Sequence, residues 1–339
     1  MERRTVLASI GIGFGVTAAG CLSETDATPV EGSEPNPNSE GGTSERASDP
    51  GEQPLSTQND SPTAVDPDTT VDRQLGDETL ESTGLRKPVQ LVLANRRSEE
   101  QTPTLVVERD ETTVLEEAFE LGPDATVHVA LTELGEYTAR VVLPETEQQP
   151  ERTESVSIGY EQFDCNQTTA TLAVTDEEIT SHVASTLMAC SGVVTATVDT
   201  GETSENEATA PAGFESDGTE SGPGHALVVH NPTDETRPTR VLIDTAAESP
   251  SSPLFDGVYT LESDATAAVD IPESGEYELT VARLDSDAVD RTQIDTGEFD
   301  CNSSTTRVEL DAAGALESVT MSTRMACPGV NAAEKPGTE

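Results

Sequence analysis

Hydrophobic and polar positions alternate in short runs along most of the chain after residue 88. The runs are rich in Val, Thr and Leu, and turn residues interrupt them every 8 to 12 positions. This period of two is typical of β-strands that bury one face. In the first half of the chain the pattern predicts strands at residues 89–95, 103–109, 113–121, 125–131, 136–143, 154–163, 168–175 and 179–189. Helical periodicity shows only around 111–119.

The same pattern returns about 136 residues later, which indicates an internal repeat. The matched pairs are Leu91-Val92-Leu93-Ala94-Asn95 with Leu227-Val228-Val229-His230-Asn231, Gly135-Glu136-Tyr137 with Gly275-Glu276-Tyr277, Phe163-Asp164-Cys165-Asn166 with Phe299-Asp300-Cys301-Asn302, and Met188-Ala189-Cys190 with Met325-Ala326-Cys327. Two homologous domains of about 105 residues therefore follow each other.

The segment around Tyr137, and its partner around Tyr277, resembles the tyrosine corner of immunoglobulin-like domains. In that family the Tyr hydroxyl hydrogen-bonds to the backbone a few residues upstream. The position two residues after the Tyr, a Cys in antibody domains, is Ala139 or Leu279 here. We therefore expect an all-β chain with two tandem immunoglobulin-like β-sandwich domains that lack the antibody-type disulfide.

At the N-terminus, Arg3 and Arg4 precede a weakly apolar run that ends in Ala18-Ala19-Gly20-Cys21. The run is shorter than the roughly 20 residues that span a bilayer. It resembles a twin-arginine export signal that ends in the lipobox of prokaryotic lipoproteins. That resemblance implies cleavage after residue 20, a lipid on Cys21, and a location on the extracellular face of the cell membrane.

The remaining boundaries follow from composition. Residues 22–84 contain no aromatic residue and 15 acidic residues against Arg46 and Arg73. Such a segment cannot bury a core. We therefore expect a signal peptide at 1–20, a disordered acidic tether at 21–85, the first sandwich at 86–198, a linker rich in Gly, Ser and Glu at 199–224, the second sandwich at 225–330 and a disordered tail at 331–339.

The charge of the chain is strongly unbalanced, with 65 acidic against 18 basic residues and a net charge of -47. This composition resembles proteins of extreme halophiles, because molar salt shortens the Debye length to about 3 Å and screens the repulsion. The chain has no basic stripe that could neutralise phosphates, and only 3% of its residues are aromatic. Nucleic-acid binding is therefore excluded.

Candidate chemistry is scarce, and we expect neither an enzyme nor a bound metal or cofactor. None of the four histidines lies in a repeated position: His128, His182, His225 and His230 align with Ala268, Val319, Val89 and Ala94. The two Met-Ala-Cys motifs have no nearby His, which a blue-copper site needs. Asp285, Asp287 and Asp290 lack the later Gly and Glu of a calcium loop, so we interpret them as a solvated turn.

The four remaining cysteines are expected to form two disulfides, Cys165–Cys190 and Cys301–Cys327. Each repeat contains one complete pair, with spacings of 25 and 26 residues. If strands flank the midpoint of each pair, a hairpin brings the two cysteines together at its open end. Val183 and Leu187 align with Thr320 and Arg324, so the second strand of the hairpin is not expected to bury the same face in both copies.

Asn166 and Asn302 begin glycosylation sequons in equivalent turns, directly after a Cys in each repeat. They are the candidate modification sites of the folded part.

The favoured hypothesis is a non-enzymatic cell-surface lipoprotein. Besides the membrane that holds its lipid, its partner would be an unknown surface or envelope protein or a glycan, and its role would be binding, adhesion or organisation of the envelope. Two alternatives stay open: an accessory subunit of a membrane transport or secretion complex, and an exported enzyme or electron carrier with an unrecognised site.

The charge generates the first prediction. Removal of Glu2, Arg3 and Arg4 with the signal takes away a net charge of +1, so the mature chain carries about -48. Repulsion grows as screening falls, so the melting temperature of the folded domains should be lower in millimolar than in molar salt. Thermal melts at both salt concentrations measure this, and an unchanged melting temperature would contradict the halophilic interpretation.

Overall fold

The computed structural model describes residues 61–77, 80, 84–146, 150–208, 224–246, 253–311 and 313–325. All of them belong to one compact unit, Thr57–Glu339. Their regular structure is 20 strands and two 3-10 turns, η1 (Tyr160–Gln162) and η2 (Thr296–Glu298). The expected all-β class is confirmed.

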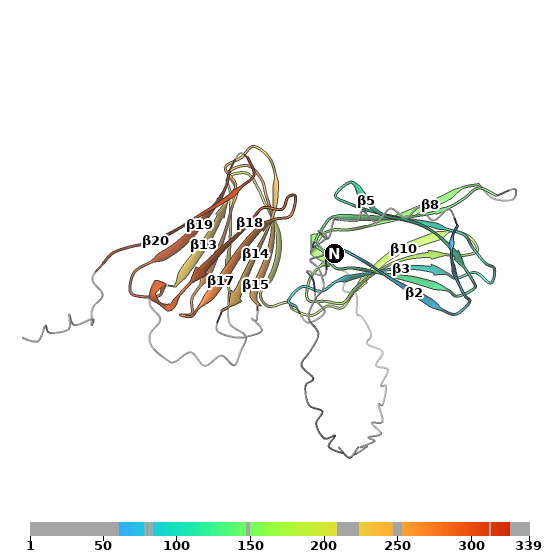
Figure 1. Ribbon diagram of the computed structural model, residues 1–339, viewed down its shortest axis with the longest axis horizontal. Coiled ribbons are helices and arrows are strands. Elements are labelled where there is room, and N and C mark those ends of the chain that lie inside the picture. The colour runs from blue at the N-terminus through green and yellow to red at the C-terminus, as the bar shows by residue number, and fades with distance from the viewer. Residues whose placement is uncertain are drawn as a thin grey trace, which may run out of the picture. The chain divides into compact units, whose positions relative to one another are not determined.

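The first sandwich consists of two five-stranded sheets (Figure 1). One sheet has the order β1-β5-β4-β7-β8 and the other β10-β9-β3-β6-β2. The strands are β1 (Thr63–Val65), β2 (Thr70–Leu75), β3 (Val89–Asn95), β4 (Thr104–Arg109), β5 (Thr112–Leu121), β6 (Thr126–Leu131), β7 (Tyr137–Leu143), β8 (Arg152–Ile158), β9 (Thr168–Val174) and β10 (Ile179–Ser185).

The second sandwich repeats this architecture strand for strand. Its sheets have the orders β11-β15-β14-β17-β18 and β12-β16-β13-β19-β20. The strands are β11 (Val193–Val198), β12 (Thr203–Glu207), β13 (His225–His230), β14 (Arg237–Thr245), β15 (Pro253–Leu261), β16 (Thr266–Ile271), β17 (Tyr277–Arg283), β18 (Val289–Ile294), β19 (Ser304–Leu310) and β20 (Leu316–Ser322). Two tandem β-sandwich domains are therefore confirmed.

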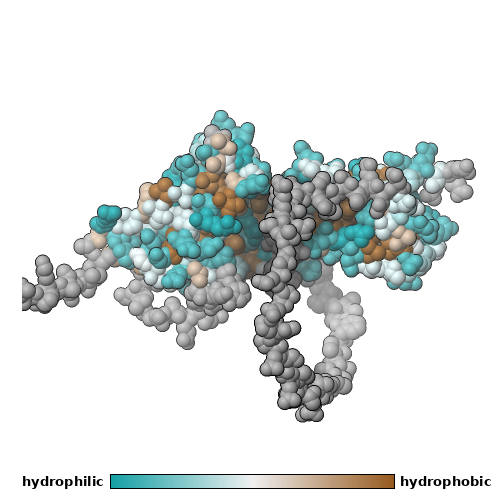
Figure 2. Space-filling view, in the orientation of Figure 1, coloured by the Kyte–Doolittle hydropathy of each residue, from teal (hydrophilic) through white to brown (hydrophobic). Residues whose placement is uncertain are grey.

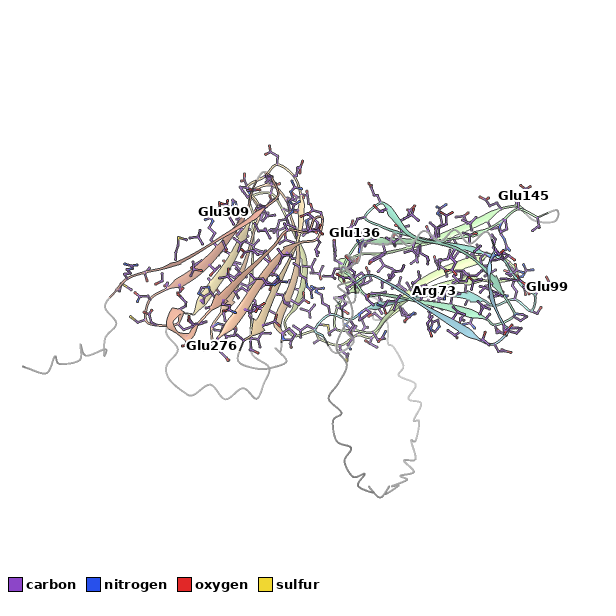
Figure 3. All side chains as sticks on the ribbon, viewed as in Figure 1. Arg73, Glu99, Glu136, Glu145, Glu276 and Glu309 are labelled. Carbon is purple, nitrogen blue, oxygen red and sulfur yellow. A yellow bond between two sulfur atoms is a disulfide. The ribbon has the colours of Figure 1, made fainter. Side chains whose placement is uncertain are left out.

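The cores form because alternate side chains of each strand face the opposite sheet. In β3 these are Val89, Leu91 and Leu93, and in β6 they are Val127, Val129 and Leu131, all fully buried. Burial of one such side chain contributes about 1.5–3 kcal/mol. Outward positions include carboxylates such as Glu309 of β19, labelled in Figure 3, and hydrophilic residues cover much of the face drawn in colour in Figure 2.

A buried asparagine ends the first core strand of each repeat and explains one of the matched motifs. The Asn95 amide group donates to the carbonyls of Glu99, Leu121 and Gly122 at 2.9–3.0 Å. Asn231 makes the equivalent three bonds at 2.8–3.0 Å in the second repeat. Each side chain thus satisfies carbonyls where the chain leaves one sheet for the other, and such buried groups are costly to leave unpaired.

The tyrosine corner is present in both domains. The Tyr137 hydroxyl donates to the Glu133 carbonyl at 3.0 Å, and the Tyr277 hydroxyl donates to the Glu273 carbonyl at 2.9 Å. Burial raises the pKa of Tyr137 to about 12. The hydroxyl therefore keeps its proton, and the corner its hydrogen bond, throughout the neutral pH range.

Strands β1 and β2 correct the expected tether at 21–85. Strand β1 pairs parallel with β5, and β2 pairs parallel with β6. Val65 and Leu80 are buried in the first core. The acidic residues between these apolar positions gave the segment the composition of a tether, but pairing with an existing strand orders it without a long apolar run of its own.

The expected boundary at residue 198 and the linker at 199–224 are also corrected. Strand β11 pairs parallel with β15, and β12 pairs parallel with β16, so both belong to the second sandwich. They correspond to β1 and β2: Thr63 lies opposite Phe119, and Ala196 lies opposite Tyr259. Each repeat thus begins two strands earlier than the sequence indicated. Strands β2 and β12 carry mainly polar and charged side chains, and the uncharged β11 lies within the range expected for the first sandwich, 86–198.

Three smaller differences concern individual strands. Residues 111–119, where helical periodicity was noted, lie mostly within strand β5. The run at 154–163 divides into β8 and the turn η1, and the run at 179–189 ends as a strand at Ser185. The expected signal peptide at 1–20 and the tail at 331–339 lie outside the described residues.

Arg86, directly ahead of β3, is a fully buried arginine that reaches into strands β11 and β15. Its guanidinium donates to the Asp256 carboxylate at 3.1 Å, the Thr195 hydroxyl at 3.0 Å and the Phe163 carbonyl at 2.6 Å, and also to the carbonyls of Val194 and Asp256. Burial lowers the pKa of Arg86, and Asp256 opposes the shift. A second arginine, Arg240, donates to the same carboxylate at 2.6 Å. The buried charges are thus paired and hydrogen-bonded, as burial requires.

The pairing of β1 and β2 generates a second prediction. A chain that begins at residue 85 loses Val65 and Leu80 from the first core, which should lower its free energy of unfolding by about 3–6 kcal/mol relative to a chain that begins at residue 57. Hydrogen exchange of the β5 and β6 amides in increasing denaturant measures this difference. A chain that begins at residue 21 is the control and should match the one that begins at 57. Equal exchange rates in all three chains would show that β1 and β2 do not stabilise the first sandwich and belong to the tether.

Candidate functional site

The last hairpin of each repeat forms one edge of its sandwich. Strand β10 is outermost in its sheet and pairs antiparallel with β9 on one side. Strand β20 is outermost in the second repeat and pairs with β19 in the same way. The Cys165–Cys190 disulfide joins the open end of the first hairpin, with 5.5 Å between the Cα atoms, which confirms this pairing. Cys301 is also disulfide-bonded. Cys327 lies outside the described residues, so its pairing with Cys301 stays a prediction.

A buried asparagine holds the loop that follows β10. The Asn166 side-chain oxygen accepts from the Met188 N–H at 2.7 Å and from the Thr186 hydroxyl at 3.0 Å. Its amide nitrogen donates to the Asp164 carboxylate at 2.8 Å. Together with the disulfide, these bonds hold the loop in one conformation.

The second repeat holds its loop in the same way. The Asn302 oxygen accepts from the Met325 N–H at 2.6 Å, and its amide nitrogen donates to the Asp300 carboxylate at 2.9 Å. Asn166 and Asn302 are only 5% and 6% exposed. The amide nitrogens are hydrogen-bonded within largely buried residues, so they are poorly accessible to a modifying enzyme once the domain has folded. The candidate glycosylation of Asn166 and Asn302 stays a prediction.

Exposed apolar side chains gather at these two hairpins. Among the described residues, seven large hydrophobic side chains are exposed, and six of them lie on β10, β20 or the following loops: Val183, Leu187, Met188, Val319, Met321 and Met325. The seventh, Val289, lies on β18. Leu187 is 97% exposed, at the tip of the loop that Asn166 holds. We call strand β10 with residues 186–188, and strand β20 with residues 323–325, the two apolar edges.

The two apolar edges differ in which face carries the apolar side chain. Val183 lies opposite the buried Ala170, so its side chain is on the inner face, yet it is 42% exposed. Val319 lies opposite Arg307, on the outer face. Thr320, the equivalent of Val183, lies opposite the buried Thr306, so both strands turn the same face inward. The expected difference in the buried face is therefore wrong, and only the positions of the exposed apolar side chains differ between the copies.

The first apolar edge is also free of charge. The 20 residues from Ile179 to Val198 include no Asp, Glu, Lys or Arg, although the chain carries 65 acidic residues. The second apolar edge has only Glu317 near its start and Arg324 in its loop. Reactive groups in the sequence give no sign of these edges. The signal that the sequence does contain is the uncharged stretch at residues 179–198 in an otherwise acidic chain.

Polar side chains surround His225, which occupies the position that Val89 has in the first repeat. Its Nδ1 is 3.1 Å from the Ser304 hydroxyl, and its Nε2 is 3.0 Å from the Thr306 hydroxyl. Ser304 in turn donates to the Glu298 carboxylate at 2.8 Å. If the ring is neutral with its proton on Nδ1, then Nδ1 donates to Ser304, Ser304 donates to Glu298, and Thr306 donates to Nε2. His225 and Ser304 are buried, and Ser304 is bonded directly to the carboxylate. The cluster therefore lacks both the order and the access of a Ser-His-acid triad.

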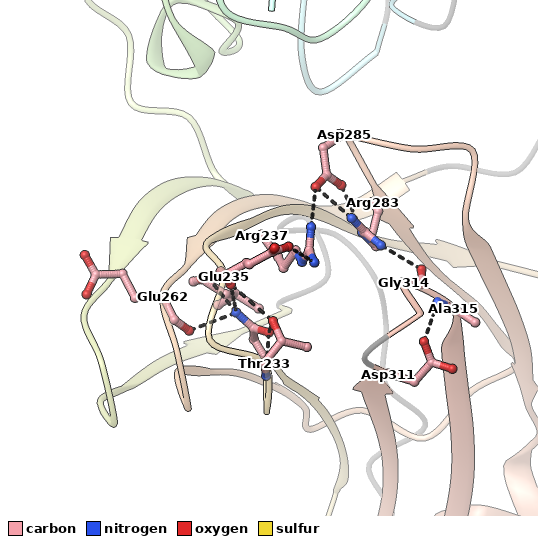
Figure 4. Close-up of polar contacts among 11 residues, drawn as sticks. Thr233, Glu235, Arg237, Glu262, Arg283, Asp285, Asp311, Gly314 and Ala315 are labelled. Carbon is pink, nitrogen blue, oxygen red and sulfur yellow. Dashed lines mark hydrogen bonds and ion pairs between the residues drawn. The ribbon is translucent and has the colours of Figure 1, made fainter.

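The acidic turn that begins at Asp285 is held by arginines (Figure 4). Arg283 donates to its carboxylate at 2.9 and 2.7 Å, and Arg237 donates at 3.3 Å. Burial alone would raise the pKa of Asp285, but these hydrogen bonds outweigh it and the pKa is lowered. Across the described ranges no group of three or more His, Cys, Asp or Glu side chains is placed to hold a metal ion.

The predicted export and anchoring residues Arg3, Arg4 and Cys21 lie outside the described residues. In the part of the chain that the structure describes, no helix has the length and apolar character needed to cross a bilayer.

Comparison with known proteins gives little. No protein-family model and no curated protein matches the chain. Among solved structures, the carbohydrate-binding module CBMbc of Eubacterium rectale Amy13K, in complex with maltoheptaose, is 8% identical, with coverage of 70% of this chain and 98% of that chain at a TM-score of 0.18. A Bacteroides uniformis protein, provisionally described as a cell adhesion protein, is 9% identical, with coverage of 70% and 97% at a TM-score of 0.18. These TM-scores are too low to indicate function.

The His225 cluster generates a third prediction. Burial lowers the pKa of His225 below its ordinary value of 6.5, and Glu298 opposes the shift. The unfolded chain therefore binds a proton before the folded one does. The stability of the second sandwich should be complete above pH 6.5 and fall below it, by at most about 1.4 kcal/mol per pH unit.

Denaturant-dependent hydrogen exchange of β13 and β19 amides from pH 7.5 to 5.5 measures this fall. His225→Gln keeps a donor and an acceptor but does not titrate, so it should flatten the profile. The corresponding strands β3 and β9, which contain Val89, are an internal control. A profile for the second sandwich that is the same in wild type and His225→Gln would show that this histidine is not responsible.

Proposed function

We propose that this protein is a non-enzymatic cell-surface module that binds a partner through its two apolar edges. In this proposal the chain is exported with Arg3 and Arg4 in its signal, and a lipid on Cys21 anchors it to the extracellular face of the membrane. Its role is then adhesion or organisation of the envelope. The order of arginine pair, apolar run and Cys supports the anchor.

The single observation that carries the binding role is the repeated position of the exposed apolar side chains. A chain with a net charge of -47 has abundant polar residues with which to cover its surface. It nevertheless leaves six of its seven exposed large hydrophobic side chains, within the described residues, on the same hairpin of each repeat. Clustered exposed apolar groups indicate interaction sites, whereas scattered ones carry no such meaning.

The held loops support the same role. Asn166 and the Cys165–Cys190 disulfide fix the loop that carries Leu187 and Met188. A side chain held in its binding conformation loses less entropy on association than a mobile one. This arrangement suits recognition of a partner.

Capture from native membranes at molar salt tests the proposal. The full-length wild-type chain should bring down a partner protein or envelope component. The Leu187→Ser/Met325→Ser variant should bring down at least tenfold less, because it removes the most exposed apolar group of each edge. Both positions are solvent-exposed, so the variant should melt at the same temperature as wild type.

Val289→Ser is the matched control, since it removes an exposed apolar side chain outside the two edges and should capture as much as wild type. A wild-type chain that always comes down alone, or a control that loses capture equally, would count against binding through the apolar edges.

A further inference from the structure

The two apolar edges share a backbone arrangement rather than a set of side chains. At equivalent positions β10 has His182, Val183 and Ala184, whereas β20 has Val319, Thr320 and Met321. Their strand register, their open side and their asparagine-held loops are nevertheless the same. A mode of binding common to both repeats must therefore use the backbone.

The hydrogen-bond pattern shows which backbone groups of β10 face outward. The Thr186 N–H donates to the Gln167 carbonyl at 3.2 Å, and the Thr175 N–H donates to the Glu178 carbonyl at 2.9 Å. Bonded pairs alternate along an antiparallel ladder. Residues such as His182 and Ala184 therefore bond to β9, and the N–H and carbonyl groups of Ser181, Val183 and Ser185 point away from it.

Strand β20 has the same alternation. The Thr323 N–H donates to the Ser303 carbonyl at 3.0 Å, and the Asp311 N–H donates to the Ala315 carbonyl at 2.9 Å. The backbone groups of Ser318, Thr320 and Ser322 therefore point away from β19. No strand among the described residues pairs with this side of β10 or β20.

The other six sheet edges are each protected in a way that β10 is not. Strands β2, β8, β12 and β18 carry charged side chains, and β1 has only three residues. Strand β11 is uncharged, but Arg86 bonds to its Val194 carbonyl and Thr195 hydroxyl. Proteins ordinarily protect an edge with charge, Pro or a short strand, since an open edge accepts another strand. Strand β10 has none of these features, and β20 has only Glu317.

We propose that β10 and β20 each accept an extended segment of a partner protein as a sixth strand of the sheet. This inference rests on the proposed binding function and names its mode. The outward backbone groups supply the hydrogen bonds, and Val183 or the residues beside Thr320 contact alternate side chains of the added strand.

Charge defines the chemistry of the segment. Strand β10 is uncharged, but Glu154 accepts from Ser181 at its beginning at 2.6 Å, and Glu177 and Glu178 precede it. The chain as a whole carries -47. Carboxylates on the added strand would be repelled, so the segment is neutral or basic and rich in β-branched residues. A second copy of this chain is the other possible occupant and is an outcome of the test below.

A synthetic peptide with the sequence of β9, flanked by one arginine at each end, is the probe. Its sequence already pairs with β10 inside the domain, and it contains no carboxylate side chain. Fluorescence anisotropy with the full-length protein in molar salt should show saturable binding. The same peptide with N-methyl groups along the edge that faces the protein should bind at least tenfold more weakly, because it has lost those donors.

Variants of the protein separate backbone from side chain. Val183→Pro/Thr320→Pro removes one outward N–H from each edge, and Pro is tolerated where a strand's N–H faces solvent. It should reduce peptide affinity at least tenfold. Val183→Thr/Thr320→Val exchanges the side chains of the two copies and keeps every N–H, so it should bind within about twofold of wild type.

Several outcomes would overturn strand addition: no binding of the peptide to wild type, equal binding of its N-methylated form, or equal binding by the proline variant. If the proline variant does not fold, the N-methylated peptide on wild type still decides. Sedimentation that shows the chain pairing with itself through these edges would replace the partner with a second copy. If native capture succeeds while the peptide experiments fail, strand addition is wrong and the proposed binding function stands.

Discussion

Each domain depends on the burial of one face of two short-stranded sheets against each other. The chain has no Trp, four Tyr and six Phe, so Val, Leu and Ile supply most of the apolar area. Some aromatic residues reach the cores at matching positions, such as Phe119 and Tyr259, both fully buried. Because each strand contributes few inward side chains, the outer strands add to the cores: Val65 of β1 and Val198 of β11 are buried there. Strands β2 and β12 extend the sheets by pairing with β6 and β16.

Buried polar side chains form the hydrogen bonds that backbone carbonyls need where no strand pairing satisfies them. Asn95 and Asn231 satisfy carbonyls where the chain crosses between sheets, and the Tyr137 and Tyr277 hydroxyls close the turns that precede these tyrosines. Arg86 does the same for carbonyls of Phe163, Val194 and Asp256. These bonds lie inside the protein, where salt screens them little, whereas the acidic surface is strongly screened. The interior of the fold is therefore insulated from the salt on which the surface depends.

Strands β10 and β20 differ from the other edge strands because their outward backbone groups are little protected. The beginning of β10 lies against β8, where Ser181 donates to Glu154, but the following residues extend past this cover. Asn166 and the disulfide then hold the loop in place although its apolar side chains face solvent. The disulfide and these hydrogen bonds stabilise the domain, and they also hold apolar side chains in solvent, which is the reason to seek the function at these edges.

The sequence by itself determined the class of fold, the repeat and the central strands. Alternation specifies a strand whose one face is buried, and strand β3 lies at the expected residues 89–95. Repetition of the cysteines selected the confirmed Cys165–Cys190 pair. Only the tertiary structure decided that residues 63–75 and 193–207 join the sheets, because their order comes from pairing with β5, β6, β15 and β16 rather than from their own composition. Only the tertiary structure, too, showed that Asn166 is buried and hydrogen-bonded and that β10 has one side without a neighbouring strand. Burial and strand pairing are properties of the assembled sheets.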